Sequence, residues 1–220
     1  MACYTVPRFG ARPLGIYEKY ILPRLLHFAC GLEEIAVQRR KVVPLAKGTV
    51  LEIGVGSGLN LPFYDSARVQ KIYGLDPSPE MRALAKSRES VGGIAVRFIE
   101  GACEDIPLGD ARADTVLVTY TLCSIGDLPA ALKEIRRVLK PGGALVFCEH
   151  GAAIEPHVRR WQDWCDPIWT RFAGGCHLNR EIPNLIEQAG FAIKALDHGY
   201  IPGWRPACFN IWGSAVHKAG

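Results

Sequence analysis

The stretch Thr49-Val-Leu-Glu-Ile-Gly-Val-Gly-Ser-Gly58 decides how the rest of the chain is interpreted. Residues 50–53 are mostly apolar and rich in β-branched side chains, which predicts a buried strand. Three glycines at alternate positions follow, and a helix is expected at about 59–67. A strand that leads through glycines into a helix brings bare backbone and a helix N-terminus up to a ligand. The spacing is not the G-x-G-x-x-G of dinucleotide binders, and the acidic Glu52 also argues against a dinucleotide.

Outward from this stretch, apolar runs alternate with helical segments. Ser78, followed by Pro79, is expected to cap a helix that runs to about Ser90. Asp127 is expected to cap another, which ends before Pro141. The predicted strands are 49–53, 72–76, 95–100, 115–119 and 144–148. Five strands that alternate with helices predict a parallel sheet with helices on both faces.

The pattern changes after Glu149. Residues 158–172 form an aromatic, amphipathic helix that either lines an apolar pocket or packs in the core. Asn179 is expected to cap a further helix that ends at Gly190. Two last strands are predicted at 191–196 and 209–216.

Residues 1–47 are expected to form a helical cap on a domain at 48–220, and the two parts form a single structural unit. Residues 14–41 have apolar side chains at helical spacing, and Pro23 is expected to divide them into two helices. This segment is either a plain cap or a lid that lines a substrate pocket or touches a membrane surface. Residues 150–180 are the expected substrate-pocket segment.

Composition excludes several classes of protein. The net charge of +4 is mild, and short basic clusters such as Arg39-Arg40-Lys41 are expected to be solvated, so no nucleic-acid partner is predicted. The eight cysteines form no C-x-x-C pair, and no signal peptide or membrane-length apolar run is recognised. The chain is therefore expected to be cytoplasmic with reduced thiols, and contact with a membrane surface is the less favoured alternative.

Two carboxylates suggest the ligand. In open parallel sheets, ligands lie beyond the carboxyl ends of the strands. Asp76 closes the second predicted strand, where it can accept hydrogen bonds from two ribose hydroxyls. Glu52 favours a ligand that carries positive charge, such as an amino group. S-adenosylmethionine combines a ribose, an adenine, an amino acid and a sulfonium, so it is the expected cofactor, with S-adenosylhomocysteine as its product.

Several motifs together resemble the class I S-adenosylmethionine-dependent methyltransferases with a type-11 methyltransferase domain. They are Val50-Leu-Glu-Ile-Gly-Val-Gly-Ser-Gly58, Leu75-Asp76, Asp105-Ile-Pro107, Asp114-Thr-Val116 and Arg137-Val-Leu-Lys-Pro-Gly-Gly143. The likeness covers residues 48–150. It implies an α/β, Rossmann-like sheet of seven strands, the last antiparallel, with helices on both faces.

The resemblance also implies roles for individual residues. Glu52 and the glycine loop would hold the methionine end, Asp76 the ribose, and Pro77 and Met81 the adenine. Many relatives have Gly-Asp-Ala-Glu where this chain has Gly101-Ala-Cys-Glu104, so contact with the adenine amino group is assigned to Glu104 and the backbone of Cys103. The expected cofactor-binding residues are Glu52, Gly54, Gly56, Gly58, Asn60, Asp76, Pro77, Met81, Cys103, Glu104, Thr119 and Leu122.

The methyl acceptor is expected near the ends of the fourth and fifth strands. A thiol is partly ionised at neutral pH, whereas a hydroxyl needs a base. His150 is the first candidate for a general base, or it simply hydrogen-bonds the sheet end or Glu149. His177 is a second candidate, or it orders the last helix; Glu149 and Cys123 complete the catalytic candidates. A metal site from Glu149, His150, Asp166, Cys176 and His177 matches no compact ligand spacing, so no metal is predicted.

A narrower resemblance adds an acceptor class. Thr121-Leu-Cys-Ser124, Cys148-Glu-His150, Trp161-Gln162, Asp166-Pro-Ile-Trp169 and Gly175-Cys-His-Leu-Asn-Arg180 resemble the alkyl thiol S-methyltransferase group, over about residues 39–217. This implies S-methylation of a small, fairly apolar thiol. The mammalian members carry an N-terminal membrane anchor, which is not expected here.

Other functions remain open. The alternatives are a phospholipid N-methyltransferase, a quinone-pathway C- or O-methyltransferase, or a non-catalytic module that binds the cofactor. Methylation of nucleic acid is disfavoured because Thr119-Tyr-Thr-Leu122 replaces the Asn-Pro-Pro-Tyr type of block. The oligomeric state is not predicted.

Overall fold

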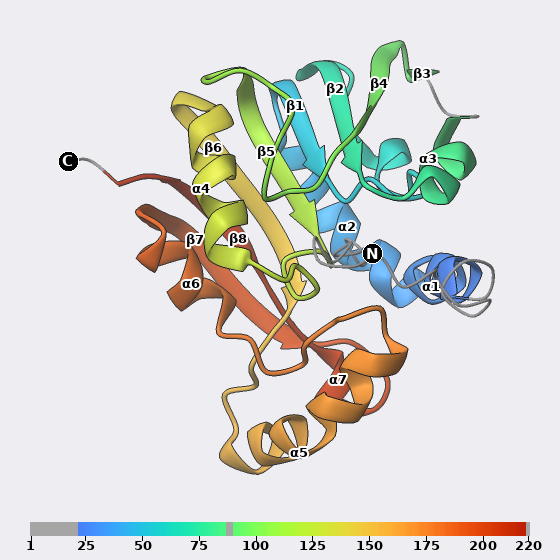
Figure 1. The fold of residues 1–220 in the computed structure, drawn as a ribbon, viewed down its shortest axis with the longest axis vertical. Helices are drawn as coiled ribbons and strands as arrows, with labels where there is room; N and C mark the ends of the chain where they lie inside the picture. Colours follow the sequence, from blue (N-terminus) through green and yellow to red (C-terminus); the bar gives the residue numbers. More distant parts are fainter. Residues whose placement is uncertain (1–21, 87–89, 219–220) are drawn as a thin grey trace, which may run out of the picture.

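A computed structural model describes residues 22–86 and 90–218, which form one mixed sheet with helices on both faces (Figure 1). The sheet order is β3-β4-β2-β1-β5-β6-β8-β7. The strands are β1 Gly48–Ile53, β2 Val69–Asp76, β3 Ser90–Val91, β4 Ile94–Glu100, β5 Ala113–Thr119, β6 Leu139–His150, β7 Phe191–Tyr200 and β8 Phe209–His217. Strands β4, β2, β1, β5 and β6 are parallel, and β8 is antiparallel to both β6 and β7. The predicted seven-stranded sheet with an antiparallel last strand is confirmed; β3, a two-residue partner of β4, adds to it.

Alternation along the strands explains why helices cover both faces. Leu51 and Ile53 belong to a core cluster shared with α4 and α6, whereas Val50 belongs to a second cluster shared with α2. The helices are α1 Leu22–Cys30, α2 Glu33–Val42, α3 Pro79–Ala85, α4 Leu128–Val138, α5 Pro156–Phe172, α6 Ile182–Gln188 and α7 Arg205–Cys208, with short 3₁₀ turns at Val43–Leu45 and Leu61–Phe63. Two of the three predicted N-caps are confirmed: Ser78 Oγ accepts from Met81 N at 3.1 Å, and Asp127 Oδ1 accepts from Ala130 N at 3.0 Å.

The predicted helix at 59–67 is wrong. Only the 3₁₀ turn Leu61–Phe63 forms there, because Pro62 has no N–H to donate and Tyr64 is already extended. The side chains on either side of this turn instead bind a buried carboxylate, as described below. The helix that begins after Ser78 also stops early, at Ala85, and Ser90 lies in β3.

One further expectation about a helix end is wrong. The residue that precedes α6 is Glu181, which makes no side-chain cap bond, and Asn179 donates instead to Asp163 Oδ1 at 2.9 Å. In the N-terminal segment, α1 begins at Leu22, beside Pro23, and a break at Gly31 and Leu32 separates it from α2. The part of the predicted first helix at 14–21 lies outside the described residues.

The carboxyl ends of the parallel strands face the part of the molecule where the remaining helices gather. In Figure 1, β5 points toward the middle of the molecule, and α1, α5 and α7 lie beyond its end. Helix α5 ends just before Gly174 and Gly175, which both have positive φ, of +63° and +83°. Across residues 22–86 and 90–218, every helix is too short or too polar to cross a membrane.

Candidate active site

The glycine loop after β1 has a backbone conformation that residues with a side chain rarely adopt. Gly54, Gly56 and Gly58 have φ values of +67°, +53° and +76°. A Cβ on Gly54 would lie 2.4 Å from Thr121 Oγ1, so the loop passes directly against the segment that follows β5. Gly54 N also donates to Leu75 O at 2.8 Å, which ties the loop to the end of β2.

Glu52 is a buried carboxyl group beneath this loop. It accepts hydrogen bonds from Asn60 Nδ2 at 2.9 Å and from Tyr64 OH at 2.7 Å. Burial raises the pKa of Glu52 to about 7, although the bonds from Tyr64 and Asn60 act in the opposite direction. A buried carboxyl group of this kind favours a ligand that brings positive charge.

Sequence reasoning missed Arg39, which was expected on a solvated face. Its side chain is only 2% exposed, and Nε donates to Asn60 Oδ1 at 2.9 Å. Asn60 also donates to Thr119 Oγ1 at 2.9 Å, so Arg39 connects α2 to the ends of β1 and β5. The sequence did contain a sign of this burial, because Ile35, Arg39 and Val42 are at helical spacing and so share one face of α2. All three are buried in the structure.

Asp76 ends β2 beside the glycine loop. Its Oδ2 accepts from Gly56 N at 2.9 Å, and its Oδ1 accepts from Ser78 N at 2.8 Å. Burial raises the pKa of Asp76 to about 6, despite these bonds from Ser78 and Gly56. Each oxygen retains a further lone pair for a ligand hydroxyl.

The other expected cofactor residues divide into exposed and buried groups. Pro77 and Glu104 are partly exposed near the ends of β2 and β4, and Met81 is buried in α3. The side chains of Cys103 and Leu122 are packed in the core, so only their backbone could contact a ligand.

Glu149 is fully buried at the end of β6. Its oxygens accept from Thr121 N at 2.9 Å and Cys123 N at 3.2 Å, and the N–H of Leu122 also faces it. Burial raises the pKa of Glu149, against the effect of these backbone donors. The carboxyl group therefore holds the loop after β5 in place, which makes it a positioning group rather than a free base.

Cys123, His150 and Cys176 meet although they are far apart in sequence. Cys176 Sγ lies 3.4 Å from Cys123 Sγ and 3.6 Å from His150 Nδ1. The Tyr120 ring packs edge-on against His150, with 5.0 Å between centroids. The hydrogen bond from Cys176, followed by burial, raises the pKa of Cys123 well above its usual range, so Cys123 is not a thiolate at neutral pH.

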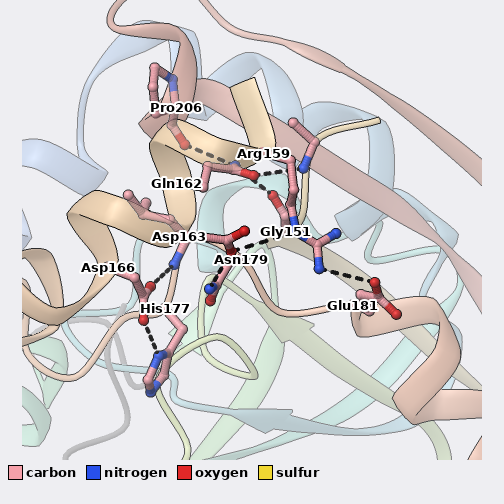
Figure 2. Close-up of polar contacts among 11 residues, drawn as sticks. Gly151, Arg159, Gln162, Asp163, Asp166, His177, Asn179, Glu181 and Pro206 are labelled. Carbon is pink, nitrogen blue, oxygen red and sulfur yellow. Dashed lines mark hydrogen bonds and ion pairs between the residues drawn. The ribbon is translucent and has the colours of Figure 1, made fainter. Parts of the chain in front are cut away.

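The side chain of His177 contacts Asp166 rather than this cluster. Its Nδ1 is 2.7 Å from Asp166 Oδ2, and Asp166 Oδ1 accepts from Leu178 N at 2.7 Å (Figure 2). In the same view, Gln162 donates from Nε2 to the carbonyl oxygens of Gly151 and Pro206, both at 3.0 Å. These contacts fasten α5 to its neighbours and hold the loop that carries His177 against α5.

An apolar cavity of about 400 Å³ lies beside the cluster. It is lined by Ala29, Cys30, Leu32, Glu34, Ile35, Tyr120, Ser124, His150, Trp169, Ala173, Cys176, Ile201, Pro202, Ala207 and Cys208. Residues of α1, α2 and the turn between them form part of its wall, as the pocket interpretation of the N-terminal segment expects. Tyr120 is unusual for a non-glycine residue in having φ of +52°, and its OH donates to Asn210 Oδ1 at 2.7 Å.

The aromatic residues of α5 match neither sequence interpretation, pocket lining or core packing, in full. Trp169 lines it, but Trp161 and Trp164 are 56% and 69% exposed and pack against each other. The face of α5 that packs inward carries Gln162 and Asp166, so the two tryptophans lie on the outward side of the helix.

Comparison with known proteins identifies the class. The methyltransferase domain family matches residues 51–147. Human thiol S-methyltransferase TMT1A is 32% identical over 218 residues, which cover 96% of this chain and 85% of that protein. A demethylmenaquinone methyltransferase from Thermus thermophilus is 34% identical over 134 residues, which cover 59% of each chain. The crystal structure of YcgJ from Bacillus subtilis has the same fold, with a TM-score of 0.66, 19% identity and coverage of 86% of this chain and 99% of that one.

The chain is therefore an S-adenosylmethionine-dependent methyltransferase with a Rossmann-like fold. Within that class it belongs to the family that includes thiol S-methyltransferase TMT1A. The predictions of the enzyme class and of S-adenosylmethionine as cofactor are confirmed.

Proposed function

We propose that the enzyme transfers the methyl group of S-adenosylmethionine to the sulfur of a small, apolar thiol bound in the cavity. This proposal rests on the position of the cavity wall next to the strand end that contacts the Glu52–Asn60 network. Tyr120 and Ser124 line the cavity, and Thr119, at the end of the strand that leads to them, bonds the Glu52–Asn60 network. The name of the human relative supports the same acceptor class.

The cofactor fits the residues beneath the glycine loop. We assign Glu52, Asn60, Thr119 and the loop to the methionine end, and Asp76 to the ribose hydroxyls. Two buried carboxyl groups of raised pKa supply the negative charge and the acceptors that these parts of the cofactor require. The glycine loop leaves room for the ligand because its backbone carries no side chains. Pro77, Met81, Glu104 and the Cys103 backbone are assigned to the adenine.

Glu52 makes a pH-dependent contribution to cofactor binding. Because its pKa is about 7, the carboxyl group loses its charge as the pH falls from 8 to 6. The dissociation constant for S-adenosylmethionine, measured by calorimetry, is expected to rise severalfold over this range, because a cation prefers a carboxylate. In Glu52→Gln the rise between pH 8 and 7 is expected to disappear; a rise that persists there would contradict the assignment.

The cofactor-free protein is expected to respond in the opposite direction. The folded-state pKa of Glu52 is above its ordinary value of 4.5, so protonation favours the folded state. This contribution to the free energy of unfolding is fully present below about pH 4.5 and is lost as the pH rises through about 7. Affinity and intrinsic stability therefore change with opposite signs at the same carboxyl group.

A thiol acceptor suits the chemistry of the wall better than a hydroxyl. A hydroxyl acceptor would need a base. Glu149, the buried carboxyl group beside the loop after β5, already accepts from backbone N–H groups, and Glu34 lies on an exposed part of the cavity wall. A thiol needs little help to ionise. We place the sulfur of the acceptor next to His150, which lines the cavity. The apolar wall then excludes water from the in-line displacement.

A panel of acceptors tests this proposal. Matched alkyl thiol, amine, phenol and quinol substrates are incubated with the enzyme and S-adenosylmethionine, and production of S-adenosylhomocysteine is measured. Apolar thiols are expected to give a kcat/KM at least about tenfold above the amine and phenol of the same shape, because the thiol alone ionises readily near neutrality. Turnover of amines or quinols without thiols would favour the phospholipid or quinone alternatives, and cofactor binding without any turnover would favour a binding module.

A further inference from the structure

The cluster of Cys123, His150 and Cys176 has the composition of a metal site. One nitrogen and two sulfur atoms lie within 4.8 Å of one another. Cys123 and Cys176 are buried, and His150 is partly buried. Clusters of exposed acidic side chains are common on protein surfaces, because water solvates them. The two thiols of this cluster are buried, so contact with water does not account for their position beside an imidazole.

Two of the three separations are close to those expected around one tetrahedral zinc ion, and the third, between Cys123 Sγ and the His150 ring nitrogen, is within 4.8 Å. With Zn–S near 2.3 Å and Zn–N near 2.05 Å, two sulfur ligands lie about 3.8 Å apart, and sulfur and nitrogen lie about 3.6 Å apart. The observed separations from Cys176 Sγ are 3.4 Å to Cys123 Sγ and 3.6 Å to His150 Nδ1. Binding a metal therefore requires small movements of side chains and no change of fold.

The charges around the cluster have both signs. Glu149, bound to the backbone N–H groups of this loop, supplies a nearby acidic group. Arg180 is partly buried near both thiols and opposes a second cation, although its NH1 donates to Leu122 O at 2.6 Å rather than to a thiol. A buried thiol gives up its proton readily only when a strong positive charge such as a metal ion compensates.

We propose that Cys123, Cys176 and His150 bind a zinc ion whose fourth position faces the apolar cavity and takes the sulfur of the acceptor thiol. His150 and Cys176 belong to the cavity wall, which places the open position on that side. Three protein ligands with one open position are the usual arrangement of a catalytic rather than a structural zinc site. The acceptor part of this proposal rests on the proposed function, whereas the zinc site itself does not.

The reaction balances without an oxidant. The acceptor thiol binds zinc as a thiolate and releases its proton to water. The thiolate sulfur then attacks the methyl carbon, and the bond from that carbon to the sulfonium sulfur breaks, leaving its electron pair on S-adenosylhomocysteine. The thioether product binds zinc weakly because it carries no charge, so it leaves the site.

Metal binding is tested on the whole reduced protein. After chelation and dialysis, Zn²⁺ is titrated against a chromophoric zinc chelator, and Co²⁺ is added separately to record its absorption spectrum. One equivalent of Zn²⁺ is expected, with thiolate-to-cobalt charge-transfer bands. Cys123→Ser, Cys176→Ser and His150→Gln are each expected to weaken zinc binding by at least about 100-fold, because each removes a direct ligand. Cys208→Ser, on the same cavity wall, is the matched control and keeps full affinity.

Thermal unfolding shows that each variant is folded before its affinity is interpreted. Absence of stoichiometric zinc binding by the folded, reduced wild type overturns the proposal, and so does a Cys208→Ser variant that loses zinc as readily as Cys176→Ser. An apolar thiol is expected to change the cobalt spectrum, whereas its S-methyl thioether leaves it unchanged; no response to the thiol overturns the acceptor role. Full thiol methylation by metal-free enzyme overturns the zinc proposal but leaves the proposed function intact. Zinc binding without thiol methylation at any metal content overturns the proposed function and the acceptor role, but leaves the zinc site intact.

Discussion

Replacing Asp76 with alanine is expected to weaken binding of S-adenosylmethionine by about a hundred-fold or more. The carboxylate is assigned to both ribose hydroxyls, and hydrogen bonds to a charged group contribute at least about 1.5 kcal/mol each. Its position is fixed by Gly56 N and Ser78 N, so a nearby side chain cannot easily replace it. Isothermal titration calorimetry with S-adenosylmethionine and with S-adenosylhomocysteine measures the loss, which is expected to be similar for both ligands.

Stability separates a specific loss of ligand contacts from general damage. Because burial raises the pKa of Asp76 to about 6, ionisation of its carboxyl group at pH 7 already opposes folding. Its removal is therefore expected to cost much less in the free energy of unfolding than in the free energy of binding. Asp197→Ala removes an exposed carboxylate on β7 and is the matched control, with unchanged affinity. Wild-type affinity in Asp76→Ala would rule out the ribose assignment.

The sheet could be predicted because most of its strands are recognisable from their own residues. Residues 50–53 and 115–119 are mostly apolar runs of strand length, and Ser78 and Asp127 cap the helices that begin after them. Local pattern could not reveal β3, whose two residues form a strand only because they pair with β4. It also gave a helix at 59–67, where Asn60 and Tyr64 make tertiary contacts with Glu52 instead.

The same distinction applies to the site. Glu52 and Asp76 could be proposed from the sequence because each lies at or next to the end of a predicted strand, close to the glycine loop. Cys123 and Cys176 lie 53 residues apart, and metal-site reasoning from sequence depends on short ligand spacings. Their meeting depends on how the loop after α5 returns to β5: His177 N donates to Cys123 O at 2.9 Å. Only the tertiary structure contains that information.

Gly54→Ala is expected to destabilise the protein by about 3 kcal/mol or more and to abolish measurable binding of S-adenosylmethionine. Two costs combine. A φ of +67° costs an alanine about 1–2 kcal/mol, and its Cβ would lie 2.4 Å from Thr121 Oγ1 and 2.8 Å from Thr121 Cγ2. Thr121 cannot easily retreat because its Oγ1 donates to Thr119 O at 3.1 Å in a fully buried position. Denaturant unfolding and calorimetry measure the two effects.

Gly142→Ala separates the backbone cost from the clash. Gly142 has φ of +76°, but no described atom lies within 4 Å of a Cβ placed there, so only the cost of about 1–2 kcal/mol is expected. Thr121→Ala removes the two atoms closest to the new Cβ, and the double variant Gly54→Ala/Thr121→Ala is expected to recover most of the additional loss. Equal costs for Gly54→Ala and Gly142→Ala would show that the loop can move away from Thr121. In that case the close approach of the segments that follow β1 and β5, at the proposed cofactor site, would not depend on the absence of a side chain at Gly54.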